Sequence, residues 1–166
     1  MFLVSPFAHP PGTMIEAIQR LGLTTGLKMC LDAGDATSYT SGQTWTDRSG
    51  NGYSVYLGTG SGSDSSDPTF NGVAGRQSAS EYWTFDGTAD YFTLNQANPS
   101  WVENLHKNSA IWGFACWLYV GASLPAAACV LFGDNASASS QTGVSAVIRS
   151  DGTLRVTVTA SSGTAA

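Results

Sequence analysis

The stretch that decides the fold class is VSAVIRSDGTLRVTVT, residues 144–159. Apolar and polar residues alternate through Leu154–Thr159, which is the period of a strand with one buried face. The pair Asp151-Gly152 separates this run from the apolar run Val144–Arg149, and Asp-Gly tolerates the positive φ angles of a type I′ turn. The stretch therefore predicts an antiparallel β-hairpin.

Six further short runs of strand character precede this hairpin, and no helical repeat separates them. They are Leu27–Asp32, Tyr53–Gly58, Tyr82–Phe85, Tyr91–Leu94, Ala110–Val120 and Ala128–Phe132. Turn residues lie between them, and the Asp-Gly-Thr-Ala-Asp segment at 86–90 predicts a second hairpin joining its two aromatic neighbours. Eight short strands predict an all-β sandwich or jelly roll of antiparallel strands.

The N-terminal residues have a different character from the rest of the chain. Residues 1–12 are apolar and contain three prolines, which predicts an extended arm. A short helix is expected next, because apolar residues recur near helical spacing and Thr13 with Glu16 matches a capping box. We therefore divide the chain into an attachment segment, 1–25, and a β-domain, 26–166, although the helix could equally pack back on that domain.

Composition excludes some classes of function. The net charge is −5, and the seven Lys and Arg residues are scattered singly, so phosphate-directed binding of nucleic acid is not expected. Residues 108–133 carry no charge and would pass a length test for a membrane helix. Pro125, the glycines and the β-branched and aromatic content of this run favour two buried strands instead.

Three cysteines, Cys30, Cys116 and Cys129, lie in apolar runs. An odd number without a paired framework predicts buried reduced thiols, with a Cys116–Cys129 bridge as the alternative. Reduced thiols suit a protein that folds in a reducing cytoplasm, including one displayed later on a particle released by lysis.

Three pieces of sequence between residues 27 and 159 resemble the concanavalin A-like lectin/glucanase superfamily in its laminin-G-like (LamG) form. They are LDAGD followed by TWTDRSGNG at 31–35 and 44–52, YWTFDGTADYF at 82–92, and IWGFACWLY at 111–119. Many such domains occur in phage and bacterial surface proteins. The resemblance implies a concanavalin A-like jelly-roll sandwich. Family domains continue past the last hairpin, so we expect a longer natural chain or a partner chain that completes the sheet.

Aromatic residues on consecutive strands are expected to fill the sandwich interior. The predicted core aromatics are Trp83, Phe85, Trp112, Phe114 and Trp117. Sugar recognition instead needs exposed aromatic faces beside polar groups. The aromatics that lie in or beside predicted loops are therefore the candidate carbohydrate-binding residues: Tyr39, Trp45, Tyr53 and Trp101.

Calcium is the cofactor that the resemblance implies, and calcium takes oxygen ligands from loops. Asp134 and Asn135 directly follow a predicted strand and are the first candidates for the metal site, with Asp32 and Asp35 the second. The alternative for either pair is that the side chains cap their own backbone turns. The same turn-forming role is predicted for Asp47, Asn51, Asp86 and Asp90.

Catalysis is not expected from this sequence. Glucanases of the family place carboxylates in an E-x-D-x-x-E motif on one strand, and retaining hydrolysis needs two carboxyl groups about 5 Å apart. Here Glu16, Glu81 and Glu103 lie in three separate contexts, and neither His9 nor His106 accompanies a G-x-S-x-G elbow. We therefore predict no catalytic residues.

The leading functional hypothesis is a non-catalytic virion surface protein, made in the bacterial cytoplasm, such as a spike, tail-fibre or capsid-decoration component. Its sandwich would bind host glycans, its arm would bind other virion proteins, and a homo-oligomer without a membrane span is expected. The alternatives are a secreted or cell-wall carbohydrate-binding or adhesion domain and, third, a polysaccharide-degrading glycoside hydrolase.

Overall fold

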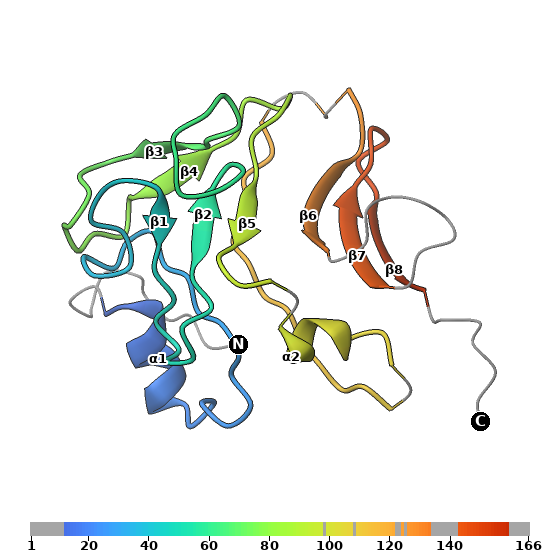
Figure 1. The fold of residues 1–166 in the computed structure, drawn as a ribbon, viewed down its shortest axis with the longest axis horizontal. Helices are drawn as coiled ribbons and strands as arrows, with labels where there is room; N and C mark the ends of the chain where they lie inside the picture. The colour runs from blue at the N-terminus through green and yellow to red at the C-terminus, as the bar shows by residue number, and fades with distance from the viewer. Residues whose placement is uncertain are drawn as a thin grey trace, which may run out of the picture. The chain divides into compact units, whose positions relative to one another are not determined.

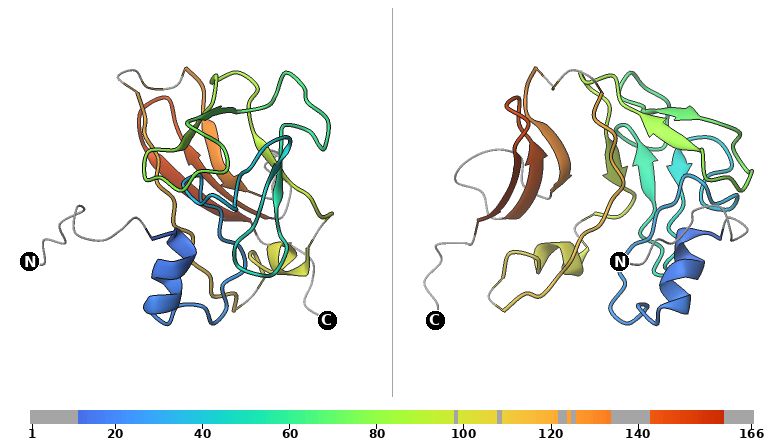
Figure 2. Two further views of the ribbon diagram at one scale, coloured as in Figure 1. Left: turned by 90° about the vertical axis from the view of Figure 1, so that its left-hand side faces the viewer. Right: turned by 180° about the vertical axis from the view of Figure 1, so that it is seen from behind.

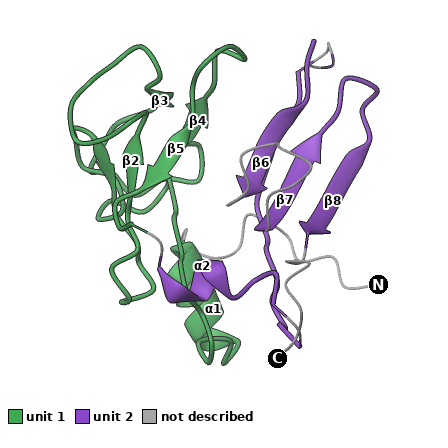
Figure 3. Cartoon of the chain, turned by 45° about the vertical axis from the view of Figure 1, so that its right-hand side comes forward, with its two compact units in different colours: residues 1–97 green, residues 98–166 purple. Residues whose placement is uncertain are grey.

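The structure is a computed structural model, and it describes residues 12–97, 99–107, 109–121, 124, 126–133 and 143–159 (Figure 1). These residues form antiparallel sheets with few helices, which confirms the all-β prediction. The chain divides into two compact units, residues 1–97 and 98–166 (Figure 3). This division lies far from the boundary at 25/26 that the sequence suggested.

The first unit contains one helix, α1 (Met14–Arg20), and two small sheets (Figure 1). The strands of the first sheet lie in the order β1 (Thr44–Trp45), β2 (Val55–Leu57), β5 (Phe92–Leu94). The second sheet pairs β3 (Thr69–Asn71) with β4 (Tyr82–Thr84). The sequence patterns did not predict β1 or β3, which have only two and three residues.

An aromatic cluster joins the two sheets of this unit. Trp45 of β1 and Phe92 of β5 have ring centroids 5.1 Å apart, and each also contacts Trp83 of β4, at 5.5 and 5.4 Å. Phe70 of β3 and Tyr39 complete the cluster, both within 5.0 Å of the Trp83 ring. Trp83, which was predicted to lie in the core, is half-buried at the centre of this cluster. Phe85 is 45% exposed, so the core prediction for it was wrong.

The predicted strand Leu27–Asp32 does not form, because loop side chains and the backbone N–H of Arg48, rather than a neighbouring strand, bind its backbone. The Asp47 carboxylate accepts the Cys30 N–H at 2.9 Å, and Asn51 Nδ2 donates to the Leu27 and Lys28 carbonyls. Asp47 also accepts the N–H groups of Ser49 and Tyr53. The turn-forming roles predicted for Asp47 and Asn51 are confirmed.

The predicted hairpin around residues 86–90 was wrong. β4 pairs with β3 and β5 pairs with β2, so the two aromatic strands belong to different sheets. The turn chemistry was right, because the Asp86 carboxylate accepts the backbone N–H groups of Thr88 and Ala89, and Asp90 accepts that of Asp86. A turn motif fixes local backbone geometry, whereas strand partners are chosen by packing.

The second unit contains α2 (Ser100–Glu103) and a sheet in the order β6 (Cys129–Gly133), β7 (Gly143–Ile148), β8 (Leu154–Thr159). Figure 2 shows its three strands side by side. The predicted hairpin is confirmed, with Ile148 opposite Leu154. Its turn is not type I′. Gly152 has φ 81°, whereas Asp151 lies outside the positive-φ region, which fits a three-residue loop with glycine in the left-handed position.

The predicted strand Ala110–Val120 is absent. Apolar and β-branched composition favours a strand only where a partner strand satisfies the backbone, and no described residue pairs with this segment. Phe114 stacks on Phe132 at 4.9 Å and Trp112 lies 6.3 Å from the same ring, but Trp117 is 94% exposed. Phe114 is itself 46% exposed, so the core predictions for Phe114 and Trp117 were both wrong.

Two other sequence alternatives can be compared with the structure. No described helix has the length and apolarity needed to cross a membrane. All three cysteines are free thiols, so the Cys116–Cys129 bridge is not formed. Cys30 is buried, as predicted, but Cys116 is exposed.

Candidate functional site

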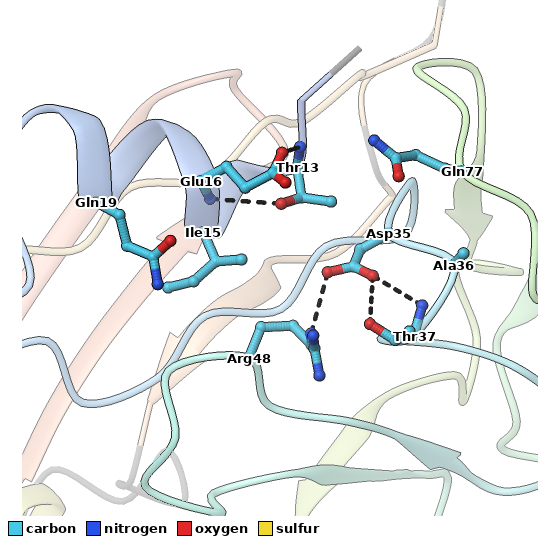
Figure 4. A pocket seen from close by; sticks show the side chains of 9 residues that line it. All are labelled: Thr13, Ile15, Glu16, Gln19, Asp35, Ala36, Thr37, Arg48 and Gln77. Atoms are coloured by element: carbon cyan, nitrogen blue, oxygen red, sulfur yellow. Dashed lines mark hydrogen bonds and ion pairs between the residues drawn. The ribbon is translucent and has the colours of Figure 1, made fainter. Parts of the chain in front are cut away.

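A polar recess of about 350 Å³ lies in the first unit, between α1 and three loops (Figure 4). We call this site the polar recess. Its lining residues are Thr13, Ile15, Glu16, Gln19, Asp35, Ala36, Thr37, Arg48 and Gln77. The recess combines carboxylate, guanidinium, amide and hydroxyl groups in one small volume, so it can both donate and accept hydrogen bonds.

One wall of the recess is the first turn of α1, and the predicted capping box builds it. The Thr13 hydroxyl accepts the Glu16 N–H at 3.4 Å, while Glu16 Oε2 accepts the Thr13 N–H at 2.8 Å (Figure 4). Gln19 follows Glu16 by three residues and therefore lies on the same face of the helix. No described residue bonds to the Gln19 amide, which leaves it available to a ligand.

The helix is fixed to its own unit. The Met14 N–H, one of the donors that a helix start leaves without an intrahelical partner, donates to Asp32 Oδ2 at 2.8 Å. Ile15 is 9% exposed and anchors the apolar side of the helix. These contacts favour the alternative that the sequence left open, in which the helix packs back on the β-domain.

The opposite wall is centred on Asp35, which is 4% exposed. Its Oδ1 accepts both the N–H and the hydroxyl of Thr37, at 2.7 and 2.6 Å, and its Oδ2 pairs with Arg48 Nε at 3.0 Å. Burial by itself would raise the pKa of Asp35, but the hydrogen bonds from Thr37 and Arg48 outweigh burial and lower it. Asp35 is therefore a carboxylate at neutral pH.

Arg48 is held at two points. Its backbone N–H donates to the Cys30 carbonyl at 2.8 Å, and its Nε is bound to Asp35. No residue in the described part of the chain bonds to its two terminal nitrogens, and the side chain is 34% exposed. Arg48 thus presents hydrogen-bond donors of fixed orientation on the wall opposite Glu16 and Gln19.

Two pairs of residues were suggested for calcium, Asp134 with Asn135 and Asp32 with Asp35. Asp134 and Asn135 lie outside the described residues. Both oxygens of Asp32 already accept backbone N–H groups, from Gly34 and Met14, and Asp35 is paired with a guanidinium. These two carboxylates do not fit a metal site. Among the described residues, no group of three His, Cys, Asp or Glu could hold a metal ion.

The four predicted carbohydrate-binding residues do not line the recess. Tyr39 and Trp45 are half-buried members of the aromatic cluster, and the Tyr39 hydroxyl donates to the Gly42 carbonyl at 3.0 Å. Tyr53 is half-buried beside Asp47, whereas Trp101 belongs to α2 in the other unit. Their role in sugar binding stays a prediction.

Sequence reasoning missed Gln19 and Arg48 as site residues. The capping box did indicate Glu16, but nothing in the local sequence brings residue 48 opposite α1. No protein-family model, curated protein or solved structure matches the chain. The functional assignment therefore rests on the recess and on the residues that build it.

Proposed function

We propose that the chain is a non-catalytic carbohydrate-binding module that holds a saccharide in the polar recess. The observation that carries this proposal is the pairing of acceptor and donor groups on facing walls, with Glu16 and Gln19 on one side and Arg48 on the other. A sugar hydroxyl both donates and accepts, so it needs both kinds of partner. The recess also falls within the range of about 300–1,000 Å³ that is usual for small-ligand sites.

The chemistry of the lining supports binding without catalysis. A glycoside hydrolase needs one carboxylic acid that stays protonated near neutral pH and a second carboxylate beside the scissile bond. The carboxyl groups of the recess are Glu16 and Asp35. Asp35 has a lowered pKa and both of its oxygens are bonded, to Thr37 and to Arg48, so it fits neither the role of the acid nor that of the second, free carboxylate.

The proposal extends to the fold and to the setting in which the module works. The aromatic cluster between two small antiparallel sheets supports a concanavalin A-like jelly-roll sandwich. The low charge content and the apolar, proline-containing residues 1–11 support display on a virion surface, with that arm bound to other virion proteins. α1 belongs to the binding module itself, because it supplies one wall of the recess.

A glycan array probed with the full chain tests the binding proposal, followed by calorimetric titration of the strongest hit. Gln19→Ala should lower the affinity for that saccharide by about tenfold, because one or two hydrogen bonds to it are lost. Gln96→Ala is the matched control, since Gln96 is exposed in the same unit and lies outside the recess. An array without a hit, or equal affinities for the two variants, would refute the proposal.

The placement on a virion is tested separately. Deletion of residues 1–11 should abolish incorporation into particles while leaving glycan affinity unchanged, because the recess begins at Thr13. Particle incorporation is measured by mass spectrometry of purified virions. Normal incorporation of the shortened chain would contradict the role given to the arm.

A further inference from the structure

Arg48 is more constrained than a surface arginine usually is. Its carboxylate partner, Asp35, has a side chain only 5% exposed and cannot turn away, because Thr37 holds its other oxygen. The Asp35 N–H also donates to the Asp32 carbonyl at 3.2 Å, which fixes the backbone from which the carboxylate projects. A donor whose position is fixed before binding loses little conformational entropy when the ligand arrives.

The ion pair uses only one of the five N–H donors of the guanidinium. The remaining donors lie on the two terminal nitrogens, which share one plane and can reach two neighbouring oxygen atoms at once. Adjacent hydroxyl groups on a sugar ring supply two such oxygens.

The net charge of the lining residues determines whether the recess favours neutral or acidic saccharides. The ionisable side chains of the lining are Glu16, Asp35 and Arg48, and their formal charges leave one net negative charge in the recess. Asp35 already compensates the positive charge of Arg48. A carboxylate or sulfate on the ligand would therefore meet the Glu16 carboxylate without a spare cation among the lining residues, whereas a hydroxyl group can donate to it.

From this geometry we infer that Arg48, oriented by Asp35, determines specificity, and that the recess selects uncharged polyhydroxyl saccharides over acidic ones. This inference rests on the proposed function. Arg48 contacts adjacent ligand hydroxyls, and Asp35 is a positioning residue that acts through Arg48. Lysine cannot replace Arg48, because a single ammonium group cannot hold the buried carboxylate and bridge two ligand oxygens at the same time.

The experiment compares Arg48→Lys with Arg76→Lys in the full chain. Arg76 is the matched control, because its Nη2 pairs with the carboxylate of Glu81 at 3.0 Å, its partner is also buried, and it lies outside the recess. The probes are the strongest neutral hit of the array and, for acidic sugars, glucuronic acid and sialic acid. Calorimetric titration measures affinity, and thermal unfolding of both variants shows whether each remains folded.

Arg48→Lys should lower the affinity for the neutral saccharide by about tenfold or more, and Arg76→Lys should change this affinity by less than about twofold. Asp35→Asn should weaken it as well, although the side chain at position 35 touches no ligand in this arrangement. Glu16→Gln keeps the capping box, because glutamine serves in the same position, and it should raise the affinity for glucuronic acid by removing the negative charge.

The outcomes distinguish the specificity role of Arg48 from the proposed function of the recess. Equal affinities for Arg48→Lys and Arg76→Lys, with Gln19→Ala still impaired, would overturn the specificity role and leave the proposed function standing. Tighter binding of glucuronic or sialic acid than of every neutral sugar would overturn the selection for uncharged ligands. If Gln19→Ala and Arg48→Lys both bind as the unaltered chain does, the recess is not the saccharide site and both proposals fail.

Discussion

Substitution of Asp47 by alanine should destabilise the first unit more than any other single carboxylate change in its loops. The Asp47 side chain is buried and accepts hydrogen bonds from the N–H groups of Cys30, Ser49 and Tyr53, at 2.9, 2.9 and 3.1 Å. Alanine would leave the buried Cys30 N–H without an acceptor, and water would only partly replace the acceptor of the Ser49 and Tyr53 N–H groups. We expect a loss of about 3–5 kcal/mol in the free energy of unfolding, because an unsatisfied buried donor costs roughly 1–3 kcal/mol.

The matched control is Asp86→Ala. The Asp86 carboxylate also accepts three backbone N–H groups, from Thr88, Ala89 and Asp90, but its loop is exposed. Water replaces the lost acceptor there, so the effect should be much smaller. The contrast isolates burial, since the number of backbone hydrogen bonds is the same in both cases.

Urea unfolding followed by tryptophan fluorescence measures the change in free energy, and amide hydrogen exchange reports the Cys30 N–H directly. Exchange at Cys30 should accelerate strongly in Asp47→Ala and remain unchanged in Asp86→Ala. The reasoning fails if both variants lose the same stability, or if the Cys30 amide stays protected when Asp47 is absent.

Three further predictions concern acidity, a crowded glycine and thiol reactivity. Burial raises the pKa of the Asp47 carboxyl, but the hydrogen bonds from Cys30 and Ser49 outweigh burial and lower it. The stabilisation that this carboxylate gives is therefore present above pH 3.8 and is lost as the pH falls below that value. Asp47→Asn should make the free energy of unfolding depend less on pH in this acid range, as acid unfolding curves can show. Gly72→Ala should lower the free energy of unfolding by about 3 kcal/mol or more, because a Cβ there would overlap the buried Glu81 carboxylate. Gly75→Ala should cost less, because φ is positive there too but no neighbour lies within 4 Å, so backbone strain alone remains; denaturant melts measure both. Burial, and after it the nearby aspartates, raise the pKa of the Cys30 thiol to about 11. A disulfide reagent at pH 8 should therefore label the exposed Cys116 before Cys30. Faster labelling of Cys30 would contradict its burial.

Local patterns in the sequence were sufficient where the interacting groups are close along the chain. Four such features form within a few residues: the capping box at Thr13, the bond from the Ser49 N–H to Asp47, the bond from the Thr88 N–H to Asp86, and the hairpin around Gly152. Their physical basis is backbone stereochemistry together with short-range hydrogen bonding. The alternation along β8 likewise predicted its strand before any tertiary information was used.

Long-range packing decided the rest, because strand character does not specify a partner. The apolar run Ala110–Val120 has the composition of a strand but no described residue pairs with it, and Leu27–Asp32 gives its backbone groups to side chains from the loop after β1. The polar recess arises in the same way. Asp35, 13 residues before Arg48 in the chain, holds that arginine in the lining that both share with α1, and only the tertiary structure brings these three parts together.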